Sequence, residues 1–159
     1  MMIKLFRGVF EFLSNYYDPC PVTYKGLTYR NSEAAYQAQK CLDERKKELF
    51  TDLSPDEAKG FGKRIAIVPA WDSQKAEIMR EIVHAKFEQH PELATQLLAT
   101  GEQELVEGNY WHDNFFGACE CPNCRDLPAE NWLGLILMDE RYRLRMEAEN
   151  EKGGELRGL

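Results

Sequence analysis

The segment NSEAAYQAQKCL, residues 31–42, constrains the fold more than any other stretch of this chain. On a helix with about 3.6 residues per turn, its small and apolar side chains fall on one side and its polar side chains on the other. The polar side chains, which share an arc of about 100°, are Glu33, Tyr36, Gln37 and Lys40. Two interpretations are open: a capped helix whose polar face meets water, and a helix whose polar face lines a site.

Length and composition restrict the class of protein. The chain has 159 residues, of which 43% are hydrophobic, enough for one compact domain with a buried core. Its formal net charge of -7 disfavours unspecific binding to nucleic acid, although a local basic groove stays open. No apolar run approaches the length of a membrane span or a signal-peptide core. We therefore expect a cytoplasmic protein without a membrane partner, and protein partners stay unknown.

The hydrophobic periodicity predicts several helices and one β-hairpin within a domain at residues 1–148, followed by a frayed polar C-terminal tail at 149–159. Residues 22–29 alternate around Lys25-Gly26 and predict a β-hairpin. Helices are expected at 31–42, 44–51, 72–89, 91–98 and 131–146, and a short strand at 104–107. Another helix is expected to begin at residues 54–57 and to be ended early by Gly60 and Gly62. Ser54 should begin one helix with a capping box, and Asp72 should cap another, with Trp71 just outside it. The apolar side chains expected in the core include Val9, Phe10, Phe12, Leu49 and Phe50.

A loop at residues 108–124, GNYWHDNFFGACECPNC, lacks helical periodicity and is typical of segments that line sites. It holds three of the five cysteines, Cys119, Cys121 and Cys124, spaced C-x-C-x2-C. An odd number of clustered cysteines favours a metal site or free thiols over a disulfide framework. A structural zinc and free thiols both stay open, and the candidates for a fourth zinc ligand are His112, Cys20 and Cys41.

The chain resembles the NADAR, or YbiA-like, family along nearly its whole length. The matching segments, in the same order and spacing, are FRGVFEFLSNYY, SEAAYQAQK, GKR, Trp71, AKFEQHPELATQLLATG, LVEGNYWHDNFFG and NWLGLILM. The resemblance implies a compact, predominantly helical α+β fold of YbiA type. It also implies a hydrolase, an N-glycosidase acting on ribosylated, phosphorylated nucleoside-like compounds. We expect no cofactor to be required for catalysis.

The same resemblance implies which residues form the site. It places catalytic roles on Glu33, Lys40 and Asp113. The expected substrate-binding positions are Arg7, Gly8, Ser14, Asn15, Tyr36, Gln37, Lys63, Arg64 and Trp71. From the residues alone, each of these also has a structural interpretation, such as a turn at Ser14-Asn15 or a solvated helix end at Lys63 and Arg64.

Cleavage of a C1'–N bond builds positive charge on the sugar and negative charge on the leaving base, so a carboxylate and a proton donor both lower the barrier. Glu33 and Asp113 can divide these roles, whereas a neutral Lys40 could instead form a Schiff base with the opened sugar. We favour ADP-ribosylated guanine, in DNA or as a nucleotide, as the substrate. The alternatives are a phosphoribosylamino-pyrimidine intermediate of riboflavin biosynthesis and a non-catalytic binder of ADP-ribose. Two features depart from the family pattern: Phe116 and the cysteine-bearing insertion after Gly117. The residues that contact the base therefore stay undetermined, and with them the choice of substrate.

Overall fold

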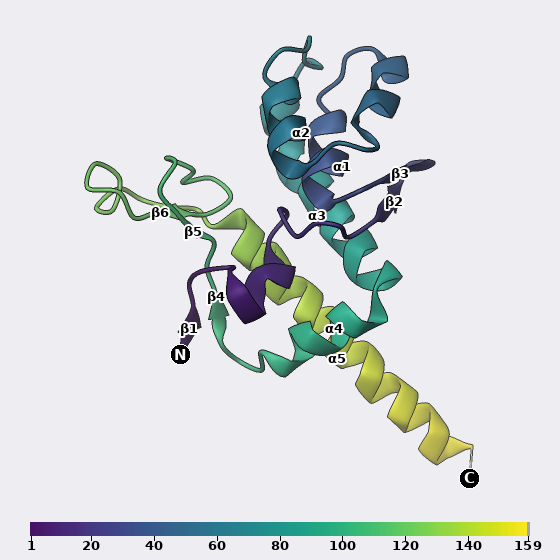
Figure 1. Ribbon diagram of the computed structural model, residues 1–159. Coiled ribbons are helices and arrows are strands. Elements are labelled where there is room, and N and C mark those ends of the chain that lie inside the picture. Colours follow the sequence, from purple (N-terminus) through teal and green to yellow (C-terminus); the bar gives the residue numbers. More distant parts are fainter. Residues whose placement is uncertain (159) are drawn as a thin grey trace. The chain divides into compact units, whose positions relative to one another are not determined.

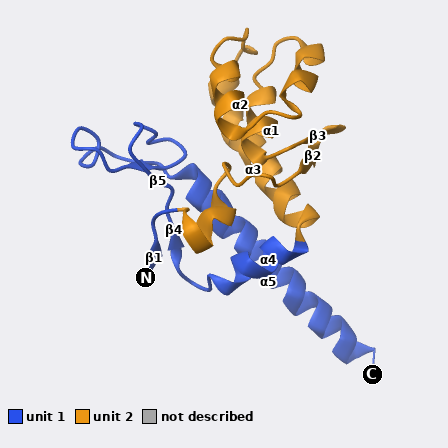
Figure 2. Ribbon diagram, viewed as in Figure 1, with its two compact units in different colours: residues 1–5, 91–159 blue, residues 6–90 orange. Residues whose placement is uncertain are grey.

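The contacts of the chain group it into two compact units in the computed structural model, which describes residues 1–158 (Figure 1). Unit 1 combines Met1–Leu5 with the chain from Pro91 onwards, and unit 2 is Phe6–His90 (Figure 2). Among the described residues, no helix has both the length and the hydropathy needed to cross a bilayer. The expected domain at residues 1–148 stays a prediction.

Unit 2 contains the predicted hairpin. Strands β2 (Val22–Tyr24) and β3 (Leu27–Tyr29) pair antiparallel, with Val22 opposite Tyr29. Lys25 and Gly26 both have positive φ, at 48° and 86°, which is the backbone of a two-residue turn that matches the twist of the strands. The hairpin prediction is confirmed.

Helix α1 (Ser32–Ala38) contacts the hairpin and three helical elements of unit 2. Those elements are the 3-10 helix η2 (Glu44–Phe50), α2 (Pro55–Gly62) and α3 (Trp71–Gln89). Ser54 caps α2 with the predicted capping box, in which Glu57 returns a hydrogen bond. The predicted helices therefore form, although α1 ends at Ala38 rather than at residue 42.

The start of α3 differs from the prediction. The helix begins at Trp71 itself, and its N-cap is Ala70 in the left-handed region with φ of 60°. Asp72 therefore lies in the first turn and is not the cap. Two expected core residues are also exposed, Val9 to 82% and Leu49 to 58%. Both lie on 3-10 helices, η1 (Gly8–Leu13) and η2. On η2, a rotation of about 120° per residue turns Leu49 away from its buried neighbour Phe50, whereas Val9 lies in the exposed first turn of η1.

Unit 1 joins short strand pairs to two helices. Strand β1 (Met2–Ile3) runs parallel to β4 (Glu104–Leu105), and β5 (Gly108–Asn109) runs parallel to β6 (Ala118–Cys119). Helix α5 (Trp132–Arg157) contacts β4 and α4 (Pro91–Ala99). Its buried apolar side chains are Leu133, Ile136 and Leu137.

The polar segment at the end of the chain is helical, contrary to the frayed tail that its composition predicted. Helix α5 continues to Arg157. Arg143 forms ion pairs with Glu140 three residues earlier and with Glu147 four residues later. Such pairs join successive turns along a helix surface, so they support the helix beyond the apolar residues that favoured it.

Candidate active site and cysteine loop

The polar face of α1 is buried. Glu33, Tyr36 and Gln37 are only 8%, 7% and 4% exposed. The Gln37 amide nitrogen donates a hydrogen bond of 2.8 Å to Oε1 of Glu33, one helical turn away. The interpretation of a solvated face is therefore wrong. A buried carboxylate needs polar partners to offset its desolvation, and this helix places one beside it.

A chain of polar contacts fixes the N-terminus of α1. The side chain of Asn31 accepts a hydrogen bond of 2.8 Å from the Ala34 amide, so Asn31 is the cap. Its amide nitrogen donates to Asp18 Oδ1 at 3.1 Å and to the Leu53 carbonyl at 3.0 Å. Arg30 binds both oxygens of Asp18, at 3.0 and 2.7 Å. These bonds set the position from which Glu33 projects.

Gly62 lets α2 approach α1 closely. A Cβ atom at this position would lie 2.1 Å from Oε1 of Gln37. Only a glycine fits without displacing the amide that holds Glu33. Gly62, the glycine of the GKR segment, is therefore needed for the close packing of α2 against α1 beside Glu33, the candidate catalytic residue.

Lys40 lies at the end of the same face, beside two aromatic rings. Its Nζ is 5.6 Å from the centre of the Tyr36 ring and 5.9 Å from that of Trp71. The two ring centres are 5.3 Å apart. Burial lowers the pKa of Lys40; the charge of Glu33 opposes this shift, and Lys75, Lys59 and Lys63 add to it. The structure thus brings together five predicted residues, Glu33, Tyr36, Gln37, Lys40 and Trp71.

The Ser14-Asn15 pair forms a turn next to α1. Ser14 Oγ accepts a hydrogen bond of 3.0 Å from the Tyr16 amide, and the Asn15 carbonyl accepts one of 3.1 Å from the Glu33 amide. Lys86, which is 2% exposed, donates to the carbonyls of Phe12 at 2.5 Å and Ser14 at 3.1 Å. Burial lowers the pKa of Lys86 to about 8.

Sequence reasoning missed Lys86. A signal was present, because Lys86 stands three and four residues after Val83 and Ile82 and so shares their buried stripe. A lysine in such a stripe must find carbonyl or carboxylate partners.

The candidate phosphate-binding residues have exposed side chains. Arg7 and Gly8 stand at the start of η1, and Gly8 has φ of 58°. Lys63 and Arg64 follow α2 directly. Their part in phosphate binding stays a prediction; the charge of Lys63 contributes to the lowered pKa of Lys40.

Asp113 belongs to unit 1, in the loop between β5 and β6. Its Oδ1 accepts hydrogen bonds from the amides of Phe115 at 3.0 Å and Phe116 at 2.9 Å. One carboxylate oxygen therefore stabilises a turn. Because Glu33 belongs to unit 2, the division of acid and base roles between the two carboxyl groups stays a prediction.

Asn109, which the sequence reasoning also missed, organises this loop. It is fully buried, and its Nδ2 donates to the Asp113 carbonyl at 2.7 Å. Its Oδ1 accepts from the amides of Trp111 at 3.3 Å and Asp113 at 3.2 Å. A single side chain thus binds the backbone on both sides of His112.

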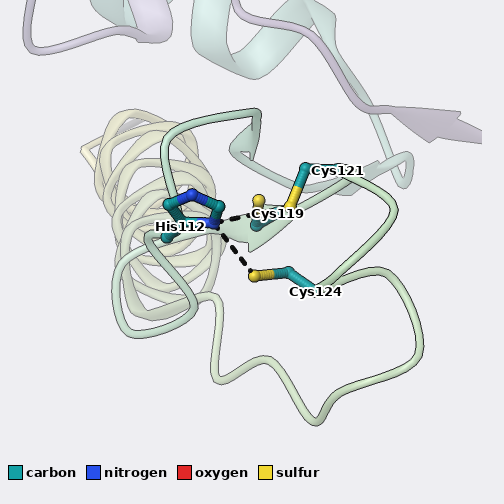
Figure 3. A group of neighbouring side chains, drawn as sticks. All are labelled: His112, Cys119, Cys121 and Cys124. Carbon is teal, nitrogen blue, oxygen red and sulfur yellow. Dashed lines mark hydrogen bonds between the residues drawn. The ribbon is translucent and has the colours of Figure 1, made fainter.

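The cysteines of this loop form a compact group with a histidine (Figure 3). We call it the HisCys3 cluster; its members are His112, Cys119, Cys121 and Cys124. One ligand atom from each lies within 4.8 Å of the others, so the four could hold a metal ion. Of the candidates for the fourth ligand, the structure selects His112. Cys20 and Cys41 are buried cysteines of unit 2 that form no disulfide bond, and they lie outside this cluster.

Comparisons with known proteins agree with this fold. A NADAR domain family model matches residues 6–145. N-glycosidase YbiA of Escherichia coli (strain K12) is 37% identical over 134 residues, which cover 80% of this chain and 78% of YbiA. N-glycosidase Npun_R5314 of Nostoc punctiforme is 30% identical over 135 residues, 81% of this chain and 83% of that protein.

Riboflavin biosynthesis protein VVA0006 of Vibrio vulnificus is 38% identical over 141 residues, 86% of this chain but 36% of that protein. The NMR structure of Escherichia coli YbiA matches with a TM-score of 0.75 and 33% identity, covering 93% of this chain and 89% of that chain. The predicted α+β, predominantly helical fold is thereby confirmed. The chain belongs to the NADAR family, and its relatives include proteins named as N-glycosidases.

Proposed function

We propose that this protein is an N-glycosidase that hydrolyses the bond between C1' of a ribose and a base nitrogen, with ADP-ribosylated guanine as its substrate. The observation that carries the proposal is the burial of Glu33 beside Lys40 and two aromatic rings. A buried acid beside a half-buried amine and two aromatic rings is costly to fold, and groups of this kind are concentrated at functional sites. The names of the relatives support the reaction class.

Glu33 is the residue to which we assign stabilisation of the sugar. As the C1'–N bond breaks, the bonding electrons leave with the base and the sugar becomes positively charged. A carboxylate held out of water acts more strongly on this charge than one in solvent. Water then adds to C1', and the base takes up a proton, which Asp113 is proposed to supply.

Lys40 offers a second route to the same products. A neutral amine can attack C1' and expel the base, and the opened sugar is then held as an imine until water releases it. The lowered pKa of Lys40 favours the neutral form that this step requires. Borohydride added during turnover should reduce the imine and leave sugar attached to Lys40, detectable by peptide mass spectrometry. A complete lack of adduct, with turnover intact, would favour direct attack by water.

The other parts of the proposed site suit a nucleotide-like substrate. Trp71 and Tyr36 offer aromatic surfaces for stacking a base or a sugar, and we assign Gln37 the role of shaping the site beside Glu33. The positive charges of Lys59, Lys63 and Lys75 act on Lys40 and would attract phosphates, as would Arg7 and Arg64. ADP-ribosylated DNA can reach the proposed site if the modified base rotates out of the base stack of the duplex.

The choice of ADP-ribosylated guanine follows from the FRGVFEFLSN opening and the WHD loop, which resemble the ADP-ribose-processing branch of the family. A riboflavin intermediate is the second candidate, favoured by the relative named as a riboflavin biosynthesis protein. A binder without turnover is the third. It is the least favoured, because binding alone would not require a buried carboxylate.

One experiment separates the three. Purified protein receives ADP-ribosyl-guanine DNA and a phosphoribosylamino-pyrimidine in parallel, and the products are identified by mass spectrometry. Free ADP-ribose supports the favoured substrate, and ribose 5-phosphate supports the second candidate. Binding of either compound without release of sugar contradicts the proposal of an enzyme. The Glu33→Gln protein is the control for release that does not depend on the site.

A further inference from the structure

We propose that the HisCys3 cluster binds one zinc ion, and that this ion holds the loop of residues 112–124 in its conformation. The four side chains come from two sides of the loop. His112 precedes Asp113, whereas Cys119 ends β6 and the other two cysteines lie in the turn that follows. Figure 3 shows the imidazole and the three thiols directed toward one another.

The distances suit a tetrahedral ion. With Zn–S bonds of about 2.3 Å and Zn–N bonds of about 2.0 Å, a nitrogen and a sulfur ligand are about 3.6 Å apart, and two sulfurs about 3.8 Å. His112 Nδ1 lies 3.2 Å from Cys124 Sγ and 3.4 Å from Cys121 Sγ. The largest separation among the four ligand atoms is within 4.8 Å. Side-chain movements of about 1 Å would therefore complete the coordination.

The donor set identifies the metal and its role. Three thiolates and an imidazole are soft ligands that favour zinc over magnesium or calcium, which prefer oxygen. Four protein ligands also fill a tetrahedral shell and leave no position for water or substrate. The ion is therefore structural and takes no part in the reaction.

The segments on either side of this loop leave large apolar side chains exposed, so burial of apolar surface there contributes little to holding the loop. Tyr110, Trp111 and Leu127 are 59%, 51% and 56% exposed. His112 has φ of 68°, a left-handed conformation that costs a residue other than glycine about 1 kcal/mol or more. Two buried thiols, Cys119 and Cys124, face this strained residue across the cluster. A metal bond to His112 would offset the strain and fix the backbone next to Asp113.

Metal analysis tests the ion directly. The protein is purified under reducing conditions without added metal, and its zinc content per chain is measured by inductively coupled plasma mass spectrometry. We expect one zinc per chain in the native protein and a loss in Cys119→Ala and Cys124→Ala. Cys41→Ala is the matched control, because it removes a buried free thiol of unit 2 and should keep the zinc.

A second measurement covers the case in which the cysteine variants do not fold. Native protein refolded with cobalt(II) should show the visible absorption of a tetrahedral thiolate centre, and His112→Asn should alter it. Native protein without bound metal, or with a disulfide between two of the cluster's cysteines, would overturn the proposal. Equal loss of zinc from Cys41→Ala would also overturn it. The outcome is independent of the proposed N-glycosidase activity, because no substrate enters the measurement.

Trypsin tests whether the ion holds the loop. Arg125 is exposed and directly follows a ligand, Cys124. Zinc-loaded protein should resist cleavage after Arg125, and chelator-treated protein should be cut there at least about tenfold faster while keeping its helical circular dichroism. Equal rates of cleavage in the two forms would show that the ion does not order the loop.

Discussion

The two units differ in charge, and the difference concerns the predicted site. Unit 2 has thirteen lysines and arginines against thirteen acidic residues, whereas the rest of the chain has seven against fourteen. The entire net charge of -7 therefore belongs to unit 1. The buried Glu33 and the half-buried Lys40 belong to the neutral unit. The net charge of the whole chain therefore overstates the electrostatic repulsion that a phosphorylated ligand would meet at unit 2.

The units also hold their candidate residues by different means. Helix α1 is buried along its whole length and is fixed by packing against α2 and by the contacts of Asn31. The loop of Asp113 is held by hydrogen bonds within a few residues and, by our proposal, by zinc. Substitutions near α1 should therefore affect the site by disturbing the packing of unit 2. Substitutions in the Asp113 loop should affect the loop alone.

Glu33→Gln should have the largest effect and separate charge from packing. The substitution keeps the size of the side chain and an acceptor for the Gln37 amide, so the free energy of unfolding should change little. Loss of the charge should lower kcat by about 10²- to 10⁴-fold. Steady-state kinetics and urea unfolding measure the two quantities. The exposed Glu48→Gln is the matched control. Near-normal turnover would remove Glu33 from the proposed mechanism.

Gly62→Ala tests the packing that positions this acid. The new Cβ would lie 2.1 Å from Gln37 Oε1, and such overpacking destabilises by about 1–3 kcal/mol. Turnover should fall as well, because the displaced amide binds Glu33. Gly60→Ala in the same helix meets no atom within 4 Å and should be neutral or slightly stabilising. Equal stability of the two variants in urea would show that the close approach of α1 and α2 is not needed.

Features set by a few neighbouring residues could be predicted from sequence. The turn at Lys25-Gly26 and the capping box of Ser54 depend on local chemistry, and both form as expected. Features set by tertiary packing could not. The sequence pattern of α1 is the same whether its polar face meets water or protein, and only the approach of α2 decides which.

Prediction of the site from sequence was limited in the same way, because tertiary contacts decide which residues meet. The resemblance supplied residue types and positions, and the structure brings Glu33, Lys40 and Trp71 together. It did not supply Lys86 or Asn109. The position of Lys86 in a buried stripe was a signal in the sequence, but the partners of both side chains are backbone groups that only the structure shows. Selecting His112 over two cysteines as the fourth ligand likewise required the loop geometry.

Asn109→Ala tests whether effects in unit 1 are local. The substitution removes the bonds to the backbone of Trp111 and Asp113 and should cost about 1–2 kcal/mol. Amide hydrogen exchange should accelerate at residues 109–116 and stay unchanged at residues 31–39. Asn150→Ala, on the exposed surface of α5, should leave both segments unchanged. Faster exchange throughout unit 2 would contradict the view that the loop is organised by its own contacts.

Asp18→Asn should have the smallest effect, and one that depends on pH. The hydrogen bond from Arg30 lowers the pKa of Asp18 below its ordinary value of 3.8. A carboxyl group with a lower pKa in the folded state stabilises that state above its unfolded pKa, and this contribution disappears as the pH falls through the folded value. At pH 7 the substitution should cost about 1 kcal/mol, because the pair is partly exposed, and the cost should shrink below about pH 4. Urea unfolding of both proteins at several pH values measures it. A cost that stays constant down to the lowest pH would mean that the charge of Asp18 does not support the cap of α1, and that the side chain acts through its hydrogen bonds instead.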